Sequence, residues 1–199
     1  IIDLEGNPVK TLAQNPVYIP AMGYDTTSPY PRGFSWRQDK PATVYGAEAQ
    51  DEGNPRKNKV EVMDIVYQLS APFAGEKEKL VQTNLRYRNI TWGNDDFALL
   101  TEYTGVSRQI KRYSFKPGKE EQPKLLFSYS SDDSYNDPGS PVMIKNQYGR
   151  RVLYTKNKNN ELLMTSQGAS PEGNMPYLSS YNMAKKQNTI LWRCQAPYY

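Results

Sequence analysis

The sequence predicts an all-β protein, and three observations lead to this prediction. Proline (15) and glycine (13) are spread through the chain. No segment keeps an apolar period of three to four residues for ten positions without one of these breakers, so we expect little helix. Short runs rich in β-branched and aromatic residues recur instead between turn-forming residues. The expected strands cover residues 42–45, 60–69, 97–103, 110–115, 124–129, 152–155 and 189–193.

A weak internal repeat groups these strands. Segment 33–39 around Trp36 (GFSWRQD) resembles segment 89–95 around Trp92 (NITWGND), and a β-rich run follows each of them. The spacing of about 56 residues is typical of propeller blades. A hairpin then follows each unit. The expected hairpins join residues 1–4 to 9–12, 63–67 to 79–81, 110–114 to 124–127 and 177–181 to 189–192.

The simplest assembly of these units is a partial β-propeller. It has about three four-stranded antiparallel blades, preceded by the outer hairpin of another blade. We expect one propeller domain over residues 1–199, with approximate blade limits at 1–15 (partial), 30–83, 85–129 and 139–195. Residues 1–4 resemble the middle of a strand, so the chain is interpreted as a piece of a longer protein. A partial array exposes blade faces and strand edges, and self-association is therefore expected.

Charge and residue counts exclude several function classes. The 25 basic and 21 acidic residues are interspersed, which argues against a nucleic-acid partner. No apolar run reaches the ~20 residues that a membrane-spanning helix needs. Histidine is absent and Cys194 is the single cysteine. Ser-His-Asp and Cys-His catalytic systems, His-ligated zinc and a thiolate metal cage are therefore excluded within the chain, and we expect no catalytic residue, metal site or cofactor.

Three polar segments have a chemical and a plain interpretation. Residues 168–172 (GASPE) approach the nucleophile pattern Gly-x-Ser-x-Gly but end in Glu172, so a turn is favoured. The carboxylate pairs Asp95-Asp96 and Asp132-Asp133 are adjacent in sequence, and neighbouring side chains of a strand point to opposite faces. Acid–base catalysis needs two carboxylates that converge on one substrate, so solvated loops are favoured for both pairs. Residues 130–139 are rich in oxygen ligands suited to calcium, but local Asx turns explain them more simply.

The aromatic residues also allow two interpretations. The 16 tyrosines, with Trp36, Trp92 and Trp192, could form a stacking surface for sugars or single-stranded bases. They mostly occupy alternating positions in the expected strands, so packing between and within blades is favoured. The glycosylation pattern Asn89-Ile90-Thr91 adjoins an expected buried strand and is rejected.

Several strings, in order, resemble a known family. They are residues 39–43 (DKPAT) with Tyr45, 64–67 (DIVY), 85–87 (LRY), 90–92 (ITW), 135–141 (YNDPGSP) and 168–174 (GASPEGN). Together they resemble the propeller of the glutamyl endopeptidase branch of the prolyl oligopeptidase family of serine peptidases, which includes plant chloroplast enzymes and bacterial dipeptidyl aminopeptidase-like enzymes. The resemblance extends from about Pro29 to Trp192 and is weakest at residues 103–108.

The resemblance implies a non-catalytic role. In the family, an N-terminal propeller covers a C-terminal α/β-hydrolase domain that carries the Ser, Asp and His, and the peptide binds between them. The chain would gate or position peptide substrates for that domain, its partner in the same protein, in a periplasmic or secreted enzyme. If the enzyme prefers acidic residues, arginine or lysine would pair with them, but the sequence identifies no substrate-binding residue. The alternatives are a stand-alone propeller-like module that binds protein or glycan, and a sugar-binding surface protein.

Overall fold

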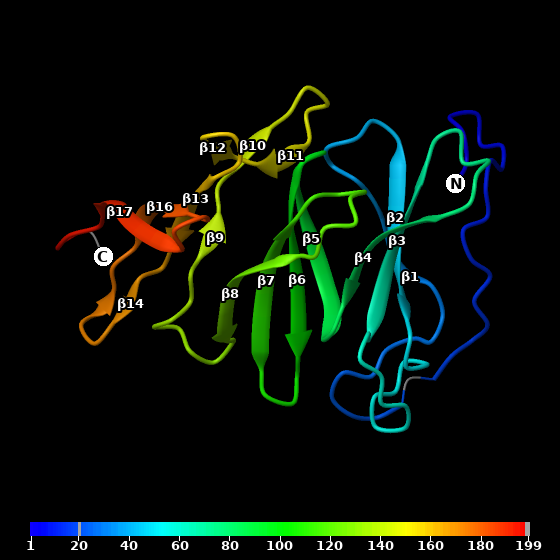
Figure 1. The fold of residues 1–199 in the computed structure, drawn as a ribbon, viewed down its shortest axis with the longest axis horizontal. Helices are drawn as coiled ribbons and strands as arrows, with labels where there is room; N and C mark the ends of the chain where they lie inside the picture. Colours follow the sequence, from blue (N-terminus) through cyan, green and yellow to red (C-terminus); the bar gives the residue numbers. More distant parts are fainter. Residues whose placement is uncertain (20, 198–199) are drawn as a thin grey trace. The chain divides into compact units, whose positions relative to one another are not determined.

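The computed structural model describes residues 1–19 and 21–197, and all of its regular structure is β (Figure 1). Within these ranges there is no helix that is long and apolar enough to cross a membrane. The prediction of an all-β protein built from four-stranded antiparallel sheets is confirmed, and none of the described sheets closes on itself. The chain divides into two compact units, Ile1–Tyr87 and Arg88–Tyr199, which are described separately below.

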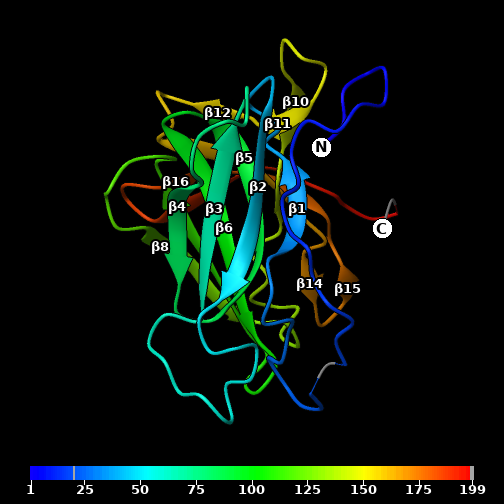
Figure 2. The same cartoon turned by 90° about the vertical axis from the view of Figure 1, so that its right-hand side faces the viewer.

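The N-terminal unit contains one four-stranded antiparallel sheet (Figure 2). Its strands follow one another in space as in sequence: β1 (Arg32–Trp36), β2 (Thr43–Ala49), β3 (Asp64–Ser70) and β4 (Glu78–Thr83). The adjacent residues Val44 and Tyr45 of β2 are both buried. Because neighbouring side chains of a strand point to opposite faces, both faces of the sheet are covered at this strand. The expected hairpin of residues 63–67 and 79–81 is present, with Tyr67 opposite Lys79.

Two strand predictions in this unit are wrong. Residues 1–12 turn back on themselves as expected, and the backbone N–H of Val9 donates to the carbonyl of Ile1 (3.0 Å). They form no strands, however, since the described bridges here amount to one isolated bridge between Ile2 and Pro8. Leu4 is fully exposed there, so the segment has no apolar face packed on a third strand, which a short hairpin needs for stability. Strand β3 also begins at Asp64 and not at Val60, whose side chain is exposed.

The first sheet of the C-terminal unit follows the prediction closely. Strand β5 (Arg86–Asn94) starts just before the unit boundary and is followed by β6 (Phe97–Thr104), β7 (Gln109–Phe115) and β8 (Lys124–Ser130), in the spatial order β5-β6-β7-β8. Trp92 lies in β5 as Trp36 lies in β1, so the sequence repeat places both tryptophans in the first strand of a four-stranded sheet. Residues 97–100 of β6 are all buried, which explains why this strand is apolar without alternation.

The second sheet of this unit has a path of four antiparallel strands, as expected for a third unit, and one further strand beside that path. It has five strands in the order β12 (Thr155–Lys156), β13 (Glu161–Ser166), β16 (Tyr177–Asn182) and β17 (Gln187–Arg193), with β9 (Ser140–Pro141) also paired to β13. Two small hairpins lie outside it: β10 (Met143–Lys145) with β11 (Arg151–Leu153), and β14 (Ala169–Ser170) with β15 (Gly173–Asn174).

The expected strand 152–155 is divided between two of these elements. Its first residues belong to β11 and its last to β12, and Tyr154 between them donates its backbone N–H to the carbonyl of Val142 (2.9 Å). The chain changes pairing partner at this residue, which a run of strand-forming residues does not reveal. The expected hairpin of residues 177–181 and 189–192 is present, with Ser180 opposite Thr189.

The core of the C-terminal unit joins its two larger sheets. Buried side chains of β6 pack with buried side chains of β11, β13 and β16 in one cluster: Phe97, Leu99, Leu153, Leu162, Met164 and Tyr181. Tyr181 also stacks on Phe127 of β8, with ring centroids 4.5 Å apart, and its hydroxyl donates to the carbonyl of Leu126 (3.3 Å). The side chains of the two sheets therefore share one apolar layer, which fixes the turns at their ends relative to each other.

Candidate functional site

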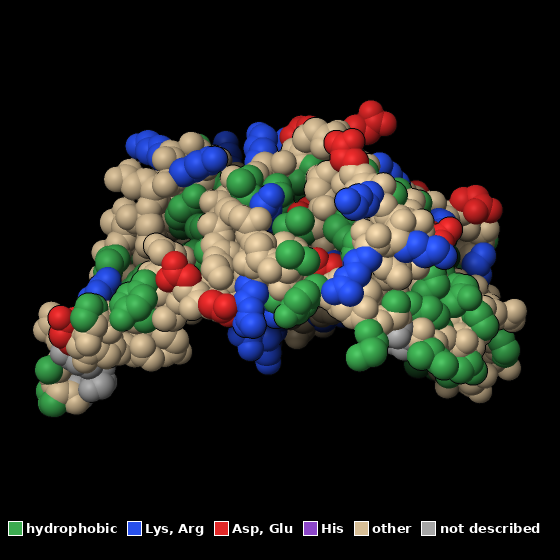
Figure 3. Space-filling view, turned by 90° about the horizontal axis from the view of Figure 1, so that it is seen from below, with side chains coloured by type: hydrophobic (Ala, Val, Ile, Leu, Met, Phe, Trp, Pro, Cys, Tyr) green, Lys and Arg blue, Asp and Glu red, His purple; other side chains and the backbone are tan. Residues whose placement is uncertain are grey.

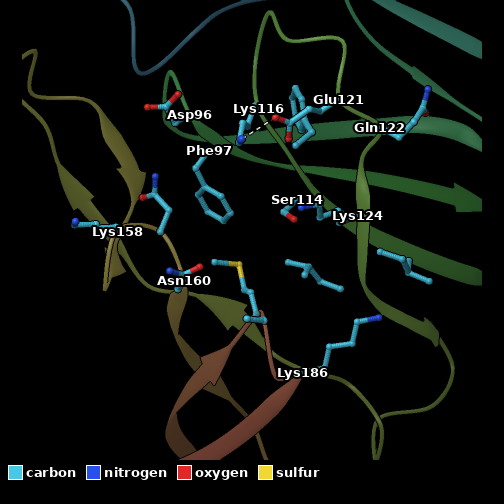
Figure 4. A pocket seen from close by; sticks show the side chains of 16 residues that line it. Asp96, Phe97, Ser114, Lys116, Glu121, Gln122, Lys124, Lys158, Asn160 and Lys186 are labelled. Carbon is cyan, nitrogen blue, oxygen red and sulfur yellow. Dashed lines mark hydrogen bonds and ion pairs between the residues drawn. The ribbon is translucent and has the colours of Figure 1, made fainter.

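A hollow of about 610 Å³ lies in the C-terminal unit where turns of its two larger sheets meet (Figure 4). We call it the lysine-rimmed hollow, because Lys116, Lys124, Lys158 and Lys186 line it. Lys116 follows β7 and Lys124 begins β8, whereas Lys158 and Lys186 lie in the turns that precede β13 and β17. The ring of Phe97 points into it from the start of β6 (Figure 4).

The charge of this hollow is positive. Its carboxylates are those of Asp96 and Glu121, and Glu121 is bound to the ammonium of Lys116 (2.8 Å). The hydrogen bond from Lys116 and its charge lower the pKa of Glu121, and the same contact raises the pKa of Lys116. In the described part of the chain, the other three lysines (Lys124, Lys158 and Lys186) form no ion pair. An anionic ligand with an apolar part fits this combination of lysines and apolar floor.

A second hollow, of about 450 Å³, lies in the same unit between the strands β5, β6 and β7 and the segment of β9 and β10. We call it the arginine hollow, because Arg88 and Arg112 line it together with Asn89, Thr101 and Ser140. Asn89, the first residue of the rejected glycosylation pattern, lies within β5 and is exposed.

Contacts with aromatic rings and with the backbone position the two arginines. The guanidinium of Arg112 lies 5.6 Å from the ring centroid of Tyr129, and that of Arg88 lies 5.4 Å from the centroid of Tyr103. Arg112 also donates through Nη1 to the carbonyl of Gly139 (2.6 Å). Gly139 has a φ of +83°, and a Cβ there would lie 2.1 Å from the carbonyl oxygen of Thr165, so only glycine fits.

Tyr113 has a perturbed pKa and lies on the face of strands β6 and β7 that is turned away from the arginine hollow. Burial and, second, the charge of Glu102 raise the pKa of Tyr113 to about 12. The folded chain holds this proton more tightly than an unfolded tyrosine with the ordinary value of 10, so the contribution to stability is complete below pH 10 and is lost as the pH rises towards 12. We expect absorbance titration of Tyr113→Phe to lack one phenol that ionises near pH 12; an unchanged high-pH step would contradict this assignment.

Four buried or largely buried charged residues of the N-terminal unit form one ion network. Asp51 and Asp64 have no exposed side-chain surface. Arg86 binds both, with Nη2 at 2.6 Å from Asp51 and Nη1 at 3.0 Å from Asp64, and Arg32 binds Asp64 at 2.6 Å. Burial alone would lower the pKa of Arg86, but the hydrogen bond to Asp51 and the two carboxylate charges outweigh it and raise this pKa. Carboxylates held this way are structural groups with no access to a ligand.

The acidic segments named from the sequence lie in turns. Asp96 is exposed in the turn between β5 and β6 and lines the lysine-rimmed hollow. Asp132 pairs with Arg108 at the surface, and Oδ1 of Asp133 accepts the backbone N–H of Tyr135 (3.1 Å), as in the expected Asx turn. Within the described ranges, no cluster of three or more His, Cys, Asp or Glu side chains is arranged to hold a metal ion.

Most of the remaining candidates have local structural roles. Ser170 lies in the β14–β15 hairpin, where its hydroxyl donates to the carbonyl of Gly173 (2.7 Å), as expected for a turn. Trp92 is buried, in agreement with the packing interpretation. Trp36 is 41% exposed but packs edge-on against Phe73 (6.0 Å between ring centroids), and Trp192 is 58% exposed.

Sequence reasoning missed Arg88 and Arg112 as possible site residues. The signal that could have found them is the placement of arginine directly beside tyrosine in residues 86–88 (RYR) and 111–113 (KRY).

The chain was also compared with known proteins. No protein-family profile matches it. It is 36% identical over 175 residues to a protein of Arabidopsis thaliana named "Probable glutamyl endopeptidase, chloroplastic", and 34% identical over 174 residues to a protein of the same name from Oryza sativa subsp. japonica. Each match covers 84% of this chain but 18% of the relative. The chain is therefore related to proteins with a peptidase name and corresponds to a small part of their length.

Proposed function

We propose that this chain is a non-catalytic segment of a serine peptidase, built from consecutive blades of a β-propeller. The observation that carries the proposal is the extent of the match, which covers 84% of this chain and 18% of each peptidase-named relative. The two antiparallel four-stranded sheets, each with strands in sequence order, support a blade architecture. The absence of histidine from the sequence supports a role other than that of the catalytic triad.

The segment acts on the peptide before the bond is cleaved. In the proposed enzyme, an α/β-hydrolase domain elsewhere in the protein supplies the nucleophile and its base, and the propeller limits the size of the substrate and contributes contacts to it. The basic hollows of the C-terminal unit support this role, because they offer cations to a peptide from well-packed strands and turns.

An assay of peptide cleavage tests the proposal. The 199-residue chain and the full-length protein that contains it are incubated with peptides of increasing length, each with an acidic, neutral or proline residue before the scissile bond. We expect cleavage by the full-length protein only, with rates that fall as the peptide becomes longer. Cleavage by the isolated chain, or a full-length protein that cleaves no peptide, would refute the proposal.

The isolated chain is further expected to self-associate through β17. This strand is at the edge of its sheet, and Ile190, Leu191 and Trp192 are each about half exposed. The face seen in Figure 3 likewise presents hydrophobic side chains between charges of both signs. An exposed edge strand pairs readily with a second copy. Sedimentation velocity should show dimers that Leu191→Lys disperses, whereas the same change at the exposed Val106, in a turn, should leave them intact; a monomeric wild-type chain would contradict this prediction.

A further inference from the structure

We propose that the arginine hollow binds a carboxylate group of a peptide, and that Arg88 and Arg112 are its ligands. The inference rests on the proposed function only in taking the ligand to be a peptide. The carboxylate belongs either to an acidic side chain or to the C-terminus of the peptide, and the two sources share the same chemistry.

The residue types at this hollow match a carboxylate. A guanidinium is planar and presents its N–H groups as a fork, which binds two carboxylate oxygens at once. Two such groups line one hollow of about 450 Å³, beside the hydroxyl-bearing side chains of Thr101 and Ser140 and the amide of Asn89. These neutral side chains can donate further hydrogen bonds to an anion without adding negative charge.

Among residues 1–19 and 21–197, no carboxylate lines the hollow. Its ten lining residues include no aspartate or glutamate, and in the described part of the chain neither Arg88 nor Arg112 has an ion pair. Glu102 is close in sequence, but its neighbour Thr101 is the residue that faces Arg112 across the strands. Adjacent strand residues point to opposite faces, so Glu102 lies on the other side of the sheet. The positive charge at the hollow is therefore available to a ligand.

Arg88 and Arg112 both lie near one side chain, the phenol of Tyr129. Burial raises the pKa of Tyr129, and the charges of Arg112 and Arg88 both oppose this rise, so both cations lie near this phenol. The other charged group that influences Tyr129 is Asp137, whose Oδ1 accepts the backbone N–H of Gly139 (2.9 Å).

Arg112 is also held before any ligand arrives. Its hydrogen bond to the Gly139 carbonyl and its hydrogen bond and ring contact with Tyr129 restrain the plane of the group and leave further guanidinium N–H groups for a ligand. A cation restrained in this way loses less conformational entropy when it binds an anion than a free surface lysine does.

Calorimetric titration of the 199-residue chain at low salt tests the proposal with three peptides. N-acetyl-Ala-Glu-Ala-amide carries a side-chain carboxylate, N-acetyl-Ala-Gln-Ala carries a C-terminal carboxylate, and N-acetyl-Ala-Gln-Ala-amide carries neither. We expect at least one of the charged peptides to bind about tenfold or more tightly than the neutral one. A difference of this size corresponds to the contribution of charge-assisted hydrogen bonds to binding. The tighter of the two identifies the source of the carboxylate. Equal affinity for all three peptides would overturn the proposal.

Variants of the two arginines assign the site. Arg88→Gln and Arg112→Gln should each remove most of this tenfold preference, and Arg112→Lys should remove it in part because lysine lacks the fork. Arg151→Gln is the matched control, since Arg151 is exposed in β11 and lies outside the hollow. Arg88 is exposed, so its variant should keep the wild-type circular dichroism spectrum even if Arg112→Gln does not.

A preference that survives Arg88→Gln, or that Arg151→Gln removes equally, would overturn the assignment. The readout is binding and requires no cleavage. An inactive full-length protein would therefore refute the proposed function and leave this result standing, while the failure of the titration would leave the proposed function intact.

Discussion

Asp64→Ala is expected to lower the free energy of unfolding by about 3–5 kcal/mol, because it breaks a buried ion network and leaves Arg32 without its carboxylate partner. The Asp64 carboxylate is fully buried and receives Nη2 of Arg32 (2.6 Å), Nη1 of Arg86 (3.0 Å) and the backbone N–H of Tyr87 (2.7 Å). Alanine removes three acceptor contacts at once, at a site where the carboxylate has no exposed surface. Urea unfolding followed by circular dichroism measures the loss.

The control for this change is an ion pair at the surface. Asp132 and Arg108 are 3.1 Å apart, and both side chains are more than half exposed. Solvent screens such a pair, so Asp132→Ala should cost only about 0–1 kcal/mol. If Asp64→Ala cost no more than Asp132→Ala, the network would not be the stabilising feature that its burial indicates.

The same network shows what the sequence could and could not predict. Arg86 lies 22 positions from Asp64 and 35 positions from Asp51, and no local pattern pairs it with either of them. Two of them nevertheless lie in strings that resemble the glutamyl endopeptidase branch, Asp64 in residues 64–67 and Arg86 in residues 85–87. Their place in the structure gives these strings a physical reason: they supply a buried ion network, and not contacts to a substrate.

Strand prediction succeeded for segments that pair along their length with a neighbouring strand, whether they are buried like β6 or exposed like β17, and failed for segments that do not. Strands β6, β7 and β8 were predicted to within one residue at each end, because turn-forming residues bound each of these runs. Residues 1–12 and 60–63 have the composition of strands but exposed side chains, so composition alone misled. The two hollows could not be predicted from the sequence. Each is lined by residues from several turns or strands, and the packing of the two sheets determines which of these lie close together.

Phe97→Ala is the second change with a large expected effect, a loss of about 3–5 kcal/mol in the free energy of unfolding. The Phe97 side chain is 4% exposed and belongs to the cluster that joins the two larger sheets of the C-terminal unit. Its position is already tight, because a Cβ on Gly93 would lie 3.1 Å from its ring. Truncation therefore removes apolar contacts and leaves a cavity that the surrounding strands cannot close fully.

Urea unfolding also measures this second loss, and Leu191→Ala is its control. Leu191 is 52% exposed on the edge strand β17, so its truncation should cost well under half as much. Phe97 also lines the lysine-rimmed hollow, and the variant should enlarge that hollow without changing its lysines. A loss for Phe97→Ala no greater than that for Leu191→Ala would mean that the shared apolar layer does not hold the two sheets together, and the geometry of the lysine-rimmed hollow would then lack its support.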